Sequence, residues 1–132
     1  MIPLLWIAGG LQLVVAASNV PVARILRLRT EFGRLSTMPR HIAFTHHAYI
    51  AGLIAAFGGL CLGFAPELAS RRPLALYLDA LLLLFWGVRF TLQLAVYDPE
   101  LRRRHRAADL FFTAAFGFLA AVFGVCLWRG FA

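Results

Sequence analysis

Lysine is absent from this chain of 132 residues, and only six residues are acidic. Without lysine there is no amine for a Schiff base, which excludes a retinal protein and a lysine-dependent aldolase. A phosphate-binding P-loop is excluded as well, because its Walker A motif needs a lysine. The sequence also lacks GxSxG, HExxH and CxxC motifs. The common hydrolase and zinc-site signatures are therefore missing.

Hydrophobic residues are abundant instead. They make up 61% of the chain, against ~45–50% in a typical soluble domain, and a soluble fold of this size has too little interior to bury them. Four apolar segments approach the ~20 residues that cross a bilayer as a helix. The first lacks a charged amino-terminal region, so we expect a retained span and not a signal peptide. The chain is predicted to be all-α, a single domain (1–132) forming a four-helix antiparallel transmembrane bundle with spans at about 2–18, 41–64, 73–97 and 107–127.

All thirteen basic residues are arginine, and the net charge is +7. Five arginines lie between the first and second segments and four between the third and fourth, whereas the middle loop has two. The positive-inside rule then places loops 19–40 and 98–106 in the cytoplasm and both termini outside, in an inner membrane of bacterial type. Because the arginines cluster in short loops beside apolar spans, membrane topology explains them better than nucleic-acid binding does.

The first basic loop has an amphipathic pattern. Arg24, Arg27, Glu31 and Arg34 recur at spacings of three and four residues, which predicts a helix lying at the lipid headgroups between spans one and two. We interpret it as an anchor on anionic lipids; the alternative is a surface for a partner membrane subunit or a second copy of the chain.

Polar residues line one face of the third span. Asp79, Trp86 and Gln93 are seven residues apart, and Arg89 and Tyr97 fall on the same stripe. Since lipid cannot solvate these groups, the stripe should face the bundle interior or another subunit.

The second span brings further polar residues to a similar depth near its cytoplasmic end. We predict a pocket in the cytoplasmic half, in which Arg89 holds a lipid headgroup or a small anion and a histidine exchanges protons. The protein would then be a non-enzymatic accessory subunit or ligand binder. In the alternative, the polar groups only fix helix register, with Arg89 bonded to Asp109, Asn19 or a backbone carbonyl. The candidate ligand-binding residues are Arg89, His46, His47, Tyr49, Trp86, Gln93 and Asp79.

Two further functions stay open. A membrane enzyme on a lipid or isoprenoid substrate would use His47 or Asp79 as general acid or base and would need a deep cavity there. A haem or metal protein would need His105 to approach His47, because no two histidines have the three- or four-residue spacing of helical ligands. No metal ligand set or cofactor is predicted otherwise.

Two cysteines lie near the outer ends of their spans. Cys61 and Cys126 reach a similar depth, so they could form a disulfide or remain two small buried thiols.

One local pattern resembles a known group of proteins. The run Phe-Trp-Gly-Val-Arg at 85–89, followed by Gln93 and Tyr97-Asp98, is similar to one in small four-span bacterial inner-membrane proteins, and His-His-Ala-Tyr at 46–49 fits the same resemblance. The resemblance implies the four-span fold; that group has no assigned activity, so it implies no function.

Overall fold

The chain is all-helical in the computed structural model, which describes residues 1–25 and 27–132. Four long helices in this part of the chain are long and apolar enough to cross a membrane, and they pack antiparallel, as predicted. Short helices complete the connections. The elements in order are α1 (Ile2–Ile25), α2 (Leu28–Gly33), α3 (Thr37–Gly63), α4 (Ala65–Leu68), α5 (Pro73–Ala95), α6 (Pro99–Arg104) and α7 (Arg106–Phe131).

The first helix extends further than its apolar sequence suggests. It passes through Pro21 and ends at Ile25, where the sequence indicated an end near residue 18. Ser18 and Asn19 donate side-chain hydrogen bonds to backbone carbonyls one turn earlier, on Val15 and Ala16. These polar groups therefore satisfy their own helix and do not interrupt it.

The amphipathic segment between the first two spans is divided. Its first part is the end of α1, and α2 forms a separate helix of six residues. Arg27 lies between them in the left-handed backbone region, at φ 51° and ψ 40°. A non-glycine residue in this conformation turns the chain sharply, which allows α2 to fold back towards α3.

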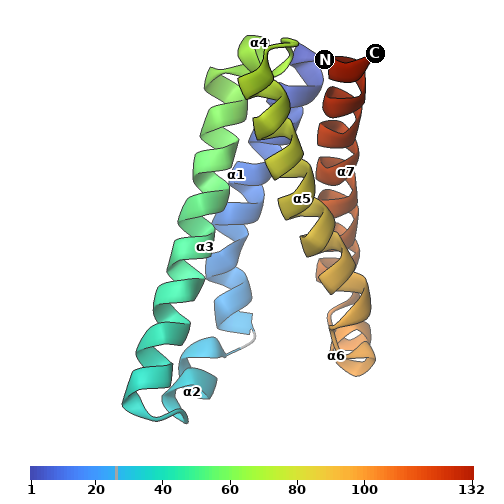
Figure 1. Cartoon of the computed structure of the whole chain (residues 1–132). Helices are drawn as coiled ribbons and strands as arrows, with labels where there is room; N and C mark the ends of the chain where they lie inside the picture. The colour runs from blue at the N-terminus through green and yellow to red at the C-terminus, as the bar shows by residue number, and fades with distance from the viewer. Residues whose placement is uncertain (26) are drawn as a thin grey trace.

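The four spans are arranged as two hairpins. α1 packs against α3 and α5 against α7, and contacts between α1 and α7 join the pairs. Figure 1 shows the hairpins close together at the end with α4 and both termini, and spread apart at the end with α2 and α6. We call the second end the basic end, because nine of the thirteen arginines belong to its connections: Arg24, Arg27, Arg29, Arg34, Arg40, Arg102, Arg103, Arg104 and Arg106.

The first hairpin depends on a close approach of two glycines. A Cβ atom on Gly58 would lie 3.0 Å from the carbonyl oxygen of Gly9, and one on Gly9 would lie 2.8 Å from Leu62 Cγ. Only glycine lets the backbones of α1 and α3 come this near, the usual role of small residues between membrane helices.

A row of aromatic rings crosses the middle of the bundle from α3 through α5 to α7. Phe57, Phe85, Trp86, Phe116 and Phe112 follow one another with ring centroids 5.0–5.8 Å apart. Trp86 has no exposed surface. The row therefore joins the second and third long helices to the last one through ring contacts in the bundle interior.

Candidate functional site

A cavity of about 160 Å³ lies between the two hairpins towards the basic end. Side chains from both hairpins and from α6 form its walls, and the aromatic ring of Phe116 belongs to the inner part. The lining residues are Val15, Ser18, Asn19, Val22, Ile50, Ile54, Arg89, Gln93, Tyr97, Leu101, Arg102, His105, Ala108, Asp109, Phe112 and Phe116.

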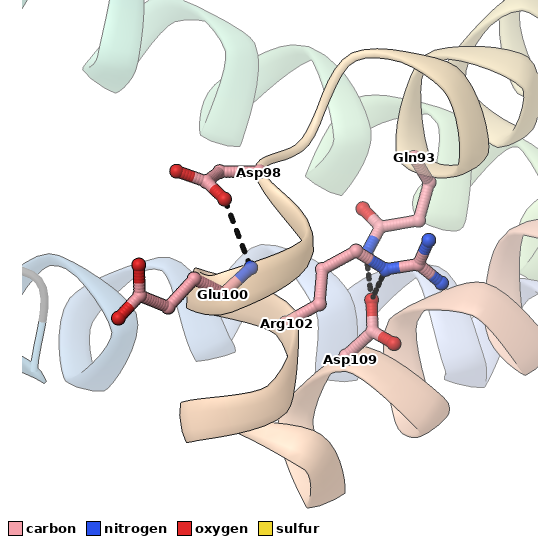
Figure 2. A network of polar contacts seen from close by, with 5 residues as sticks. All are labelled: Gln93, Asp98, Glu100, Arg102 and Asp109. Atoms are coloured by element: carbon pink, nitrogen blue, oxygen red, sulfur yellow. Dashed lines mark hydrogen bonds and ion pairs between the residues drawn. The ribbon is translucent and has the colours of Figure 1, made fainter.

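One carboxylate organises the polar wall of this cavity. Asp109 Oδ1 accepts a hydrogen bond of 3.0 Å from Gln93 Nε2 and another of 2.8 Å from Arg102 Nε, which is also an ion pair. Figure 2 shows the three side chains converging from α5, α6 and α7. The bond to Asp109 also raises the pKa of the Arg102 guanidinium. The network therefore joins α5, α6 and α7 and uses one N–H of Gln93 and the Nε–H of Arg102.

Local sequence explains how α6 brings Arg102 to this position. Asp98 is the N-cap of α6 and accepts a hydrogen bond of 2.9 Å from the backbone N–H of Glu100 (Figure 2). Pro99 follows at the first helical position, where its fixed φ suits a helix start. One turn later, Arg102 projects towards the first turn of α7, where Asp109 also favours the positive end of the helix dipole.

Arg89 lines the same cavity but is outside this network. Its guanidinium carbon lies 5.2 Å from the centroid of the Phe116 ring, a cation–π contact. Among the residues that the structure describes, the Arg89 side chain makes no hydrogen bond and no ion pair. Neither Asp109 nor Asn19, two partners that a purely structural role would use, bonds to Arg89. Asp109 Oδ1 accepts from Gln93 and Arg102, and Asn19 Nδ2 donates to its own helix. A half-buried guanidinium with five N–H donors is thus left without a protein acceptor.

The remaining polar residues of the α5 stripe are buried, in agreement with the predicted inward face. Trp86, Gln93 and Asp79 are 0%, 7% and 1% exposed. Trp86 stacks on Phe116 beneath the cavity, and Asp79 lies closer to the opposite end of α5. Neither the carboxyl of Asp79 nor the indole N–H of Trp86 has a hydrogen-bond partner within the described part of the chain. Of the stripe, only Arg89, Gln93 and Tyr97 line the cavity.

The residues predicted on α3 lie apart from the cavity lining. His46 shares the helix face of Ile50 and Ile54 but lies one turn nearer the basic end, where the hairpins have separated; it is exposed, and its Nδ1 is 2.9 Å from the Ile42 carbonyl oxygen. His47 borders a shallow depression with residues of α1 and α2. Tyr49 is 70% exposed. His46 is thus displaced along the helix from the lining residues Ile50 and Ile54, whereas His47 and Tyr49 lie on other faces of α3.

Three residues of the cavity were missing from the predicted site: Arg102, His105 and Asp109. From the sequence, the arginines after span three are interpreted as a topology signal only, and the sequence therefore does not predict that this segment lines the cavity. The Asp98-Pro99 dipeptide is the sequence signal for a new helix start, and it points to a segment that folds back over the end of the bundle.

The structure also shows where the two cysteines and the histidines considered as metal or haem ligands lie. Cys61 and Cys126 are both free and buried, and Cys61 Sγ accepts a hydrogen bond of 3.3 Å from Gln12 Nε2. Among the described residues no group of three or more histidine, cysteine or acidic side chains could hold a metal ion. His105 lines the cavity, whereas His47 faces α1 and α2, so the pair needed for a bis-histidine haem is not brought together.

The fold defines a class: a small polytopic membrane protein with four spans. Its bundle has a cavity towards the basic end, lined by apolar and polar side chains. The chain matches no protein-family model, no curated protein and no solved structure.

Proposed function

We propose that this membrane protein binds an anionic group, from a lipid headgroup or a small anion, in the cavity at the basic end. The observation that carries the proposal is the guanidinium of Arg89, which faces the cavity and has no acceptor among the described residues. Arginine is the side chain best suited to bind carboxylate or phosphate through paired hydrogen bonds. A bound anion would supply the missing acceptor.

The charge balance of the cavity supports the same conclusion. Its lining contains two guanidinium groups, Arg89 and Arg102, and one carboxylate, Asp109. Because the carboxylate is already paired with Arg102 at 2.8 Å, one positive charge is left over. The nine arginines around the basic end add a positive field that attracts anions towards the opening.

The proposed orientation follows from the same arginines. The positive-inside rule favours the basic end in the cytoplasm, so the cavity would receive its ligand from the cytoplasm or the inner leaflet. The alternative of an acid–base enzyme is less well supported, because neither His47 nor Asp79 lines this cavity.

The test is binding of three anionic probes to protein reconstituted in phosphatidylcholine nanodiscs: inorganic phosphate, hexanoate, and phosphatidylglycerol added to the disc. We expect at least one probe to bind the wild type and to bind Arg89→Gln roughly tenfold to a hundredfold more weakly, the range for losing hydrogen bonds to a charged group. Arg104→Gln is the matched control, since Arg104 is exposed, carries the same charge and is absent from the cavity lining. Equal binding by all three proteins, or equal loss in both variants, would refute the proposal.

A further inference from the structure

We infer that the ligand of this cavity is a small monocarboxylate with a short apolar body; this rests on the proposed function and specifies its ligand class. Three properties of the cavity lead to this class: its size, its charge and the distribution of polar groups on its walls.

The size favours a small molecule over a phospholipid. A volume of about 160 Å³ corresponds to roughly five water molecules at their share of liquid volume, and lies well below the ~300 Å³ at which pockets for drug-sized ligands begin. The two acyl chains of a phospholipid would have to lie outside a cavity of this volume. A carboxylate carrying about five carbons or one aromatic ring is of the right size.

The charge favours a single negative charge. The cavity has one unpaired positive charge, on Arg89, while Asp109 and Arg102 neutralise each other. A monoanion at Arg89 leaves the site neutral. A phosphate dianion would leave an excess negative charge close to the Asp109 carboxylate, in surroundings where unpaired charge is costly.

The two hairpins present different surfaces to the ligand. The side of the second hairpin and α6 is polar, and Arg89 is the guanidinium there that has no bond to a described residue. On the first, the inner wall consists of Val15, Ile50 and Ile54, and the nearby polar groups, Ser18 and Asn19, donate to their own backbone. An inorganic anion beside this apolar wall would lose hydrating water and gain no hydrogen bond from the wall in exchange.

An organic carboxylate can make a polar contact with one wall and an apolar contact with the other. Its planar carboxylate matches the fork of the Arg89 guanidinium, and its apolar body covers the wall of α1 and α3. Phe112 and Phe116 extend the apolar surface on the α7 side. The apolar body then lies against the inner wall of Val15, Ile50 and Ile54, and the carboxylate meets Arg89.

The experiment is calorimetric titration of the full-length protein in phosphatidylcholine nanodiscs with acetate, hexanoate, benzoate, oleate and inorganic phosphate. We expect hexanoate and benzoate to bind at least tenfold more tightly than acetate, because burying each methylene adds to affinity. Both should lose binding in Arg89→Gln. Oleate tests whether the same carboxylate site accepts a membrane fatty acid: binding as tight as that of hexanoate would place the source of the ligand in the bilayer, and weaker binding would place it in water.

A second variant tests the apolar wall without touching the charge. Ile50→Phe should narrow the cavity and weaken hexanoate binding about tenfold while leaving acetate binding unchanged; Ile42→Phe, two turns away on the same helix face and outside the lining, is its control. If phosphate or phosphatidylglycerol binds in an Arg89-dependent way and no carboxylate does, the inferred ligand class is wrong and the proposed function stands. If no probe distinguishes Arg89→Gln from the wild type, both fail.

Discussion

Replacing Arg89 by methionine should stabilise the empty protein and abolish the stabilisation that a ligand provides. Methionine has a similar length and fills irregular apolar space, so Arg89→Met removes the charge with little change in packing. The side chain makes no hydrogen bond to any described residue, and its contact with Phe116 is at 5.2 Å. The substitution therefore removes a charged group that makes few stabilising contacts with the rest of the protein.

The magnitude follows from two opposing contributions. A partly buried charged group that lacks an acceptor costs roughly 1–3 kcal/mol, and the lost cation–π contact is worth roughly 0.5–1 kcal/mol at a partly solvated site. Arg89→Met should thus raise the free energy of unfolding by up to about 2.5 kcal/mol without ligand. A ligand at a hundred times its Kd stabilises the wild type by about 2.7 kcal/mol. With ligand present, the wild type should therefore have the higher free energy of unfolding.

The assay is unfolding in mixed micelles by increasing fractions of sodium dodecyl sulfate, followed by tryptophan fluorescence, with and without saturating hexanoate. Arg104→Met is the control and should change the stability by less than about 0.5 kcal/mol, as is usual for surface substitutions. If Arg89→Met is less stable than the wild type under both conditions, Arg89 is a structural residue and the reasoning is refuted.

Three further predictions concern the surroundings of the cavity. Asp109→Asn should tighten hexanoate binding in the same titration, because it removes the carboxylate that competes with the ligand for positive charge; unchanged or weaker binding would contradict this. Gly58→Ala should be less stable in mixed micelles than Gly59→Ala by about 1–3 kcal/mol, the cost of overpacking, because both gain the same helix propensity and only Gly58 meets the neighbouring backbone; equal stabilities would show that the helices can separate freely. Asp98→Ala should speed amide hydrogen exchange at Glu100, which loses its cap bond of 2.9 Å, and unaltered exchange would mean that the cap does not hold α6.

The spans could be predicted because the bilayer imposes a length and an apolar composition on each helix. The inward face of α5 could be predicted too, since helical periodicity alone places Asp79, Trp86 and Gln93 on one stripe, and all three are buried. Both inferences use only properties of one helix. The group of small bacterial proteins that the sequence resembles is not identified by any match.

The composition of the cavity could be predicted only in part, because it depends on how helices are rotated and spread relative to one another. The sequence predicts similar depths for His46 and Arg89, yet His46 lies one turn nearer the basic end than the lining residue Ile50, and it is exposed. His105 and Arg102 enter the lining because α6 folds back after Asp98. The direction in which α6 folds back depends on tertiary contacts, here the ion pair of 2.8 Å between Arg102 and Asp109. The periodicity of the sequence does not predict such contacts.

Two ionisable side chains in α5 lack a partner among the described residues, and the difference between them explains why only one indicates a ligand. Asp79 is almost completely buried, beyond the aromatic row and outside the cavity lining. A carboxyl in such a place can lose its charge by taking up a proton. A guanidinium cannot lose its charge under any condition in which the protein is folded, and Arg89 must therefore find negative charge or water. Ser18 and Asn19 donate to backbone carbonyls, Asp109 Oδ1 accepts from Gln93 and Arg102, and none of these three residues bonds to Arg89. A bundle whose polar groups served only to fix helix register would gain stability by pairing this last charge or replacing it with an apolar residue. The position of Arg89 at the wall of a cavity therefore supports our proposal that an anion binds there.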